Sequence, residues 1–319
     1  MCQNVVAFAQ PQPNLPELRF TQKRAASPGT QFKMLIQRFF RMYWRTPSYN
    51  FTRFMCYIFL SVLLGVMYIN VDYSAYSGAT SGMGMMFMLA LFGSVVCFNC
   101  MLPLASEERP SFYRERACQT YQAWWYFVAS TLVEIPYCIG LALIIIATFY
   151  PLVGFSGSAA DIFLFIFGFT LLAILSVSIG EFLAFAIPQI EIASLMLILI
   201  NGIFSLFVGF NPPASQIPSG YRWLYHITPL KYCLALLTSI AFGKCDDGTE
   251  YGCLVLRDVS PAILNKVGTP TITLKTFVEE IFEMRADEVG WNILGIFISI
   301  FVFRFGTLLS MQFLNYQKR

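Results

Sequence analysis

Few residue combinations in this sequence have types and spacing suited to catalysis or metal binding. Cys97 and Cys100 have the spacing of a redox or metal-binding pair, but they lie inside an apolar run, where cysteine is usually a small packing residue. His226 is the single histidine, which excludes a metal site built from several histidines, and we expect a hydrogen-bonded loop residue there. The sequence therefore predicts no catalytic residue and no metal site.

ATP hydrolysis would need a phosphate-binding loop of the pattern G-x-x-x-x-G-K-[ST], whose backbone amides hold the phosphates. The nearest stretch, FGKCDDG at 242–248, does not have this pattern. We therefore expect no bound cofactor and no enzymatic activity from this chain alone.

Three charged residues stand inside long apolar runs: Glu134, Glu181 and Arg304. Charges at membrane depth are costly and tend to be functional. We predict that Arg304 forms a structural ion pair with Glu181 or Glu134. The alternative, a proton relay, would need a chain of carboxylates across the membrane, which the sequence lacks.

The composition of the chain predicts the type of secondary structure that holds these residues. Of 319 residues, 57% are hydrophobic and 12% are charged, whereas soluble domains carry about 25% charged residues. A bilayer core requires apolar runs of about 17–25 residues. We predict an all-α, polytopic membrane protein with six transmembrane helices, at residues 54–69, 83–104, 127–154, 162–183, 192–210 and 291–314.

The distribution of Lys and Arg predicts the orientation, because these residues accumulate in short cytoplasmic loops. Residues 1–53 hold eight of them against one acid, and the stretch 105–121 adds three, whereas 70–82 and 155–161 hold none. We predict that both termini and 105–121 are cytosolic, with a large extracellular loop at 211–290. The protein would lie in the plasma membrane.

Residues 1–27 are expected to form a flexible cytosolic lead-in, followed by a connecting helix at 28–47. Its apolar residues recur at the helical spacing i, i+3, i+4, i+7, with Lys33, Arg38, Arg41 and Arg45 outside the stripe. We expect this helix to lie in the membrane interface with its apolar face towards lipid. It would either serve only as a lipid anchor or also contact a cytosolic partner. The stripe consists of Phe32, Leu35, Ile36, Phe39, Phe40 and Tyr43.

The stretch ASEERPSFYRERACQTY, 105–121, places three acids and three arginines between two apolar runs. Pro110 suits a first helical turn, and we predict a short cytosolic helix at 106–121 with an apolar stripe of Tyr113, Ala117 and Tyr121. A surface of mixed charge suits docking to a folded protein, where complementary charges fix the register. The alternative is a solvated loop with balanced charge.

This stretch resembles the coupling helix of the G subfamily of ABC transporters, of the pleiotropic-drug-resistance type. The family pattern is close to E-[DR]-R-x-x-F-Y-R-E-R-x-x-x-x-Y. The resemblance extends through VEIPY at 133–137, GFNPP at 209–213, GYRWLYHITPLKY at 220–232 and the final NYQKR. It is strongest to the second membrane half of a full-size transporter. The matching positions are Glu108, Arg109, Phe112, Tyr113, Arg114, Glu115, Arg116 and Tyr121.

The resemblance implies the transmembrane domain of an ATP-driven exporter of hydrophobic or amphipathic compounds, which would be drugs, xenobiotics or lipids. The chain would be either one permease half that borrows ATP-binding domains from another chain or a fragment of a larger gene product. Its partners would be nucleotide-binding domains, which bind ATP and Mg²⁺ and push on the cytosolic helix, a second transmembrane half and the bilayer, but no nucleic acid. The second and fifth spans of the family line the slot for the substrate. The corresponding candidates here are Phe87, Phe92, Phe98, Asn99, Asn201, Phe204, Phe207 and Phe210.

Outer-loop cysteines form a further candidate pair. Cys245 and Cys253 flank the turn-rich stretch DDGTEYG in a loop predicted to be extracellular, where disulfides persist. The family resemblance also implies a disulfide here. Cys233 would be either a buried thiol in a re-entrant segment or a bridge to a partner chain.

Two other classes of protein are considered. An ion- or proton-coupled secondary transporter would show inverted repeats or paired broken helices, and the sequence has neither. A non-transporting remnant that folds in the membrane would have the same sequence features. An upstream reading frame that encodes a phosphate-binding loop would favour the transporter.

Overall fold

The computed structural model describes residues 24, 26–155, 157–245, 248, 250–268 and 270–316. The described chain is helical, apart from two isolated β-bridges. The α-helices are α2 (Pro28–Arg45), α3 (Pro47–Met67), α4 (Tyr76–Ala117), α5 (Ala123–Val153), α6 (Ala159–Ala186), α7 (Ile190–Leu206), α8 (Arg222–Ile227), α9 (Pro229–Phe242), α10 (Pro261–Val267), α11 (Leu274–Phe282) and α12 (Val289–Phe313). The 3₁₀ helices are η1 (Ala214–Gln216), η2 (Ser219–Tyr221), η3 (Tyr251–Cys253) and η4 (Ala286–Glu288).

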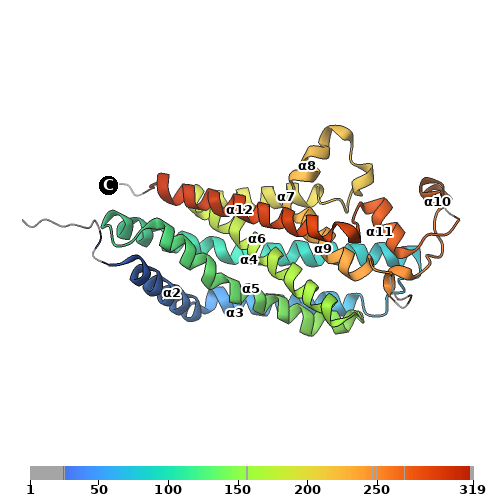
Figure 1. Ribbon diagram of the computed structural model, residues 1–319, viewed down its shortest axis with the longest axis horizontal. Coiled ribbons are helices and arrows are strands. Elements are labelled where there is room, and N and C mark those ends of the chain that lie inside the picture. The colour runs from blue at the N-terminus through green and yellow to red at the C-terminus, as the bar shows by residue number, and fades with distance from the viewer. Residues whose placement is uncertain are drawn as a thin grey trace, which may run out of the picture.

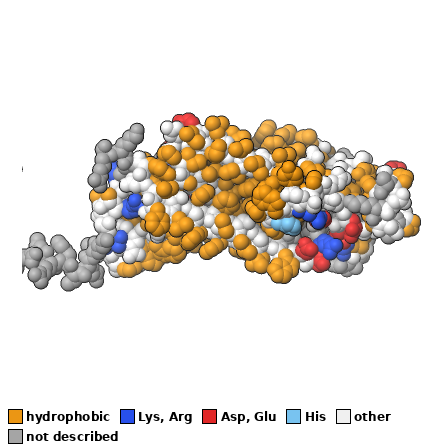
Figure 2. Space-filling model, turned by 90° about the horizontal axis from the view of Figure 1, so that it is seen from above, with side chains coloured by type: hydrophobic (Ala, Val, Ile, Leu, Met, Phe, Trp, Pro, Cys, Tyr) orange, Lys and Arg blue, Asp and Glu red, His pale blue; other side chains and the backbone are white. Residues whose placement is uncertain are grey.

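The long helices run side by side along the longest axis of an elongated bundle (Figure 1). Helix α6 lies at its centre and packs against α4, α5, α9 and α12. We call the end that contains the start of α2, the end of α4 and the end of α12 the basic end. The opposite end, which contains Cys245 and Cys253, is called the disulfide end. Hydrophobic side chains cover the flank between the two ends (Figure 2).

Within the described residues, five helices are long and apolar enough to cross a membrane: α3, α4, α5, α6 and the stretch Ala286–Phe313. The segment predicted at 192–210 forms only the 17-residue α7, which begins after Pro188 and is followed by Phe207. Most of its large side chains are exposed, and only Ala193 and Leu197 are buried. Five of the six predicted spans therefore correspond to long apolar helices, whereas the one at 192–210 corresponds to a shorter apolar helix.

Helix α4 differs from the prediction at its carboxyl end. A separate helix was expected at 106–121, but residues Tyr76–Ala117 form one continuous helix of 42 residues. Pro103 and Pro110 lie within it. An interior proline lacks the backbone donor, and its ring crowds the carbonyl four residues earlier, yet the helix continues through both. The span and the charged stretch therefore belong to one continuous helix.

The segment 211–290 is not simply an extracellular loop. It contains α9, an apolar helix of 14 residues that packs against α4, α6, α7 and α12. Eleven of its residues are buried, and the Cys233 side chain has no exposed surface. The sequence did not predict α9 as a span because its apolar run is shorter than the length needed to cross a bilayer. The burial of Cys233 agrees with the buried-thiol alternative given for it.

Helix α2 begins where sequence signals place it, with Ser27 as N-cap and Pro28 in the first turn. Its apolar face does not lie against lipid as predicted. Leu35, Phe39 and Tyr43 are buried against the protein, mainly against α5. Phe40 of the predicted stripe is 52% exposed, because the buried face is narrower than the stripe.

Candidate functional site

The charged stretch at the end of α4 is tied to α2 by an ion-pair cluster. Arg38 contacts Glu108 at 3.0 Å and Glu115 at 2.6 Å. The hydroxyl of Tyr121 donates to Glu115 at 2.6 Å. Burial alone would lower the pKa of Arg38, but the hydrogen bond and charge of Glu115 and the charge of Glu108 raise it above its ordinary value. Arg38 therefore stays charged and joins α2 to α4.

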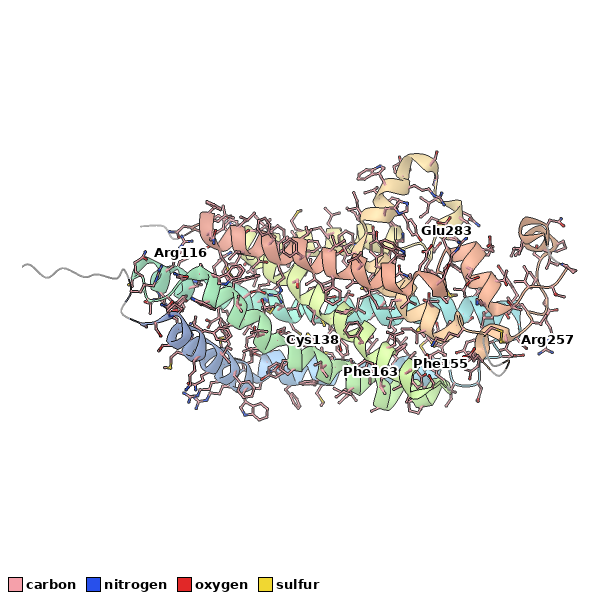
Figure 3. All side chains as sticks on the ribbon, viewed as in Figure 1. Arg116, Cys138, Phe155, Phe163, Arg257 and Glu283 are labelled. Atoms are coloured by element: carbon pink, nitrogen blue, oxygen red, sulfur yellow. A yellow bond between two sulfur atoms is a disulfide. The ribbon has the colours of Figure 1, made fainter. Side chains whose placement is uncertain are left out.

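Two arginines of the same stretch hold the carboxyl ends of other helices. Arg109 Nη1 donates to the carbonyls of Ala184 and Ile187, both at 2.5 Å, at the end of α6. Arg116 Nη1 donates to the carbonyls of Met311 and Gln312 at the end of α12. The last carbonyls of a helix have no partner within the helix and attract cations. The end of α4 thus links α2, α6 and α12 (Figure 3, Arg116).

Aromatic packing fixes this stretch in place. Phe112 has no exposed surface, and its ring lies 4.6 Å from that of Tyr126 and 5.8 Å from that of Phe185. Tyr113 and Tyr121 are also buried. Of the predicted apolar stripe, only Ala117 is exposed.

The charges that remain on the outside are fewer than the sequence suggests. Glu107 and Arg114 are exposed, and Arg114 contacts only the nearby Ser111 hydroxyl at 3.4 Å among the described residues. The mixed-charge face predicted for docking is therefore largely turned inward. The surface open to a partner is centred on these two side chains.

Two buried ion pairs lie in the middle of the bundle. Arg304 Nη1 of α12 contacts Glu181 Oε2 of α6, and Ser130 also donates to Glu181 at 3.3 Å. Glu134 does not serve as the alternative partner of Arg304. It accepts instead from Arg53 at 2.5 Å and from Tyr49 at 2.9 Å.

Arg53 and Arg38 are the residues that sequence reasoning missed. Arg53 was counted with the cytosolic cations, because the first span was expected to begin at 54. In the structure α3 begins at Pro47, so that Arg53 lies in its second turn with 1% of its surface exposed. The helix-start proline was a usable signal. Nothing in the sequence indicated the partners of Arg38.

The eight candidate substrate residues do not form one site. Phe98, Asn201 and Phe204 line a narrow crevice between α4, α6, α7 and the start of α9. Phe87 stacks on Phe210 with ring centroids 5.0 Å apart, nearer the disulfide end. The other three candidates are dispersed: Phe92 and Asn99 on the exposed side of α4, and Phe207 beside Tyr221.

Cys245 and Cys253 form a disulfide with a Cα–Cα distance of 4.9 Å. The segment that it closes packs on neighbouring turns: the Tyr251 hydroxyl donates to the Gly154 carbonyl at 2.8 Å, and Lys244 contacts Asp161 at the start of α6. Gly154 itself has a φ of 80°, in the left-handed region that favours glycine at a helix end. The disulfide end is therefore held by a covalent bond, a hydrogen bond and an ion pair.

A bundle of long apolar helices with a basic end and internally paired charges is typical of an integral, multi-pass membrane protein. The chain belongs to the ABC-2 type transporter family, which it matches over residues 30–242. That match confirms the resemblance noted in the sequence. It covers a membrane domain, and no nucleotide-binding domain was found in the chain.

Plant proteins of the G family show the same relationship over nearly the whole chain. ABC transporter G family member 49 of Oryza sativa subsp. japonica is 28% identical over 99% of this chain. G family members 36 and 35 of Arabidopsis thaliana are each 27% identical, over 95% and 100% of this chain. The chain spans only 20% to 22% of the length of these relatives.

Proposed function

We propose that this chain is the transmembrane domain of an ATP-driven exporter of hydrophobic or amphipathic compounds, with ATP hydrolysis supplied by nucleotide-binding domains outside the chain. The observation that carries the proposal is the linkage of α2, α6 and α12 through the end of α4. Arg38, Arg109 and Arg116 join four elements at one end, so that a force applied there moves them together.

Lys and Arg are concentrated at the basic end, which supports a cytosolic location for it. A nucleotide-binding domain would then contact Glu107 and Arg114, the exposed charges of the α4 end. In this arrangement α7 makes the sixth crossing, as a short span beside α4, and α9 is a re-entrant helix. A plasma-membrane location and both termini on the cytosolic side belong to the same proposal.

The substrate path would lie between α4, α7 and a second transmembrane half. Helix α7 offers an apolar, mostly exposed surface to such a partner, and Phe92 and Asn99 of α4 are exposed as well. The crevice lined by Phe98, Asn201 and Phe204 has aromatic walls and an amide, which suit a flat apolar ligand. It is narrow, so that export would require the helices around it to separate.

A secondary transporter is disfavoured by the two ion pairs. Glu134 and Glu181, two buried acids of the long described helices, each accept from an arginine. A proton relay needs carboxylates that are free to exchange protons along a path, and both of these carboxylates are engaged by a guanidinium. Neither acid is therefore available for a proton relay.

The experiment uses the chain in a complex with its nucleotide-binding domains. We expect Glu107→Lys combined with Arg114→Glu to abolish substrate-stimulated ATPase activity and transport while membrane insertion remains intact. Arg116 is left unchanged because it holds the end of α12. The matched control is Lys33→Glu combined with Arg41→Glu, which reverses two exposed charges on α2 and should leave coupling unchanged.

Normal transport and normal substrate-stimulated ATPase activity in the α4 double variant would refute the coupling role. A loss of both activities in the α2 control as well would mean that the general charge of the basic end matters, not the α4 surface.

A further inference from the structure

A polar pocket opens at the basic end between the end of α4, the start of α5 and the end of α12. Its open space is about 800 Å³, including solvent at the mouth. None of the described residues that line it is acidic, and two are arginines, which makes the pocket attractive to an anion. The lining consists of Arg24, Tyr113, Arg116, Ala117, Gln119, Tyr121, Ala123, Gln312 and Asn315.

Two donors in this pocket have no partner among the described residues. The Tyr113 side chain is 3% exposed, and its buried hydroxyl makes no hydrogen bond there. The same is true of Arg24 Nε, although Arg24 Nη2 donates to Gln119 at 3.1 Å. Buried polar groups are nearly always hydrogen-bonded, and an unsatisfied one costs about 1–3 kcal/mol. An acceptor bound in the pocket would satisfy both.

Two further features favour a negatively charged ligand. Ala123, in the first turn of α5, lines the pocket, and Gln122 at the N-cap makes no side-chain capping hydrogen bond. The positive end of a 31-residue helix therefore faces this region. Both hydrogen bonds from Arg116 to the end of α12 use Nη1, and within the described residues its other nitrogens make no hydrogen bond that would compete with a ligand.

The position of the pocket relative to the membrane indicates where the anion comes from. Trp124, next to Ala123, is 48% exposed, and Trp44 at the end of α2 is 76% exposed. Tryptophan gathers at the membrane–water interface, at the level of the lipid headgroups. We propose that this pocket binds the phosphate monoester of an anionic phospholipid, which offers several acceptor oxygens to Arg24, Arg116 and Tyr113.

The test is a native mass spectrometry titration of the full chain in detergent. The probes are dioctanoyl phosphatidic acid, dioctanoyl phosphatidylserine and inorganic phosphate. We expect phosphatidic acid to bind at least about tenfold more tightly than phosphatidylserine, because only the monoester supplies three terminal oxygens. Tyr113→Phe and Arg24→Gln should each raise the Kd for phosphatidic acid about tenfold, the effect of losing one hydrogen bond to a charged group.

Arg41→Gln is the matched control: it removes one exposed cation at the same end and should leave the Kd unchanged. Tyr113→Phe should not lower the thermal midpoint without lipid, because the described structure gives its hydroxyl no partner and removing an unsatisfied buried group costs no hydrogen bond. Binding of inorganic phosphate with the same dependence on Tyr113 would support the site with free phosphate as its ligand. Equal binding of both lipids, or a Kd insensitive to Tyr113→Phe and Arg24→Gln, would overturn it.

Discussion

Arginine has different surroundings in the middle of the bundle and at its basic end. In the middle, Arg53 and Arg304 are almost fully buried, and each faces a single glutamate. At the basic end, Arg38 and Arg109 are partly exposed and contact acids or helix-end carbonyls. The buried arginines each neutralise one buried acid inside the bundle, whereas the partly exposed arginines connect the ends of several helices.

The largest effect is expected for Arg304→Leu. Removing one partner of a buried pair leaves an uncompensated charge and costs about 3–5 kcal/mol. We expect a lower yield and a lower thermal midpoint in detergent, and the double change Arg304→Leu with Glu181→Leu should recover part of the loss. A single variant as stable as the parent protein would mean that Arg304 reaches water and that the two regions do not differ.

A smaller effect is expected for Arg53→Lys, which keeps the charge. Arg53 Nη1 donates to Glu134 and to Tyr49, and its Nη2 contacts two cysteine sulfurs, including Cys138 at 3.4 Å (Figure 3). A lysine ammonium cannot reproduce this planar fork, and we expect a loss of about 1–3 kcal/mol. Arg304→Lys is the matched control and should cost less, because Arg304 has a single acceptor in the described structure. Thermal unfolding of both variants checks this. If Arg304→Lys lost as much stability as Arg53→Lys or more, the planar guanidinium of Arg53 would not matter.

The smallest effect is expected at the basic end, for Arg38→Gln. Exposed ion pairs contribute about 0–1 kcal/mol, and this contribution should vanish in 1 M salt, where the screening length is about 3 Å. The stability difference between Arg38→Gln and the parent protein, measured at low and high salt, checks this. A loss of stability above about 2 kcal/mol that persists at high salt would mean that Arg38 behaves like the buried arginines.

Apolar run length and charge distribution were sufficient to predict an all-helical membrane bundle. They failed where a helix is short or where a partner is remote. Helix α9 was not predicted as a span because packing among neighbours, and not length, keeps its 14 residues in the bundle. The continuous α4 was missed because proline is favoured at a helix start and disfavoured in a helix interior, where the structure nevertheless places Pro110.

Prediction of the candidate site from the sequence was limited in the same way, because the partners of its residues are remote in the chain. The sequence indicated that the stretch at the end of α4 carries unusual charges, and that Arg304 needs an acid. It could not indicate that Arg109 and Arg116 would contact backbone carbonyls, because every helix end offers the same groups. Nor could it choose between Glu181 and Glu134 without the position of Arg53, which takes the second acid.

The pairing of Glu181 with Arg304 also has a consequence for the order of events during biosynthesis. The two residues are 123 positions apart, so that α6 is made well before its partner helix. At about 5–20 residues per second, translation leaves an interval of roughly 6–25 s between them. During that interval the carboxyl group of Glu181 is in the membrane without its arginine. The nascent chain must then keep it protonated, hydrated or held by an insertion factor until α12 arrives.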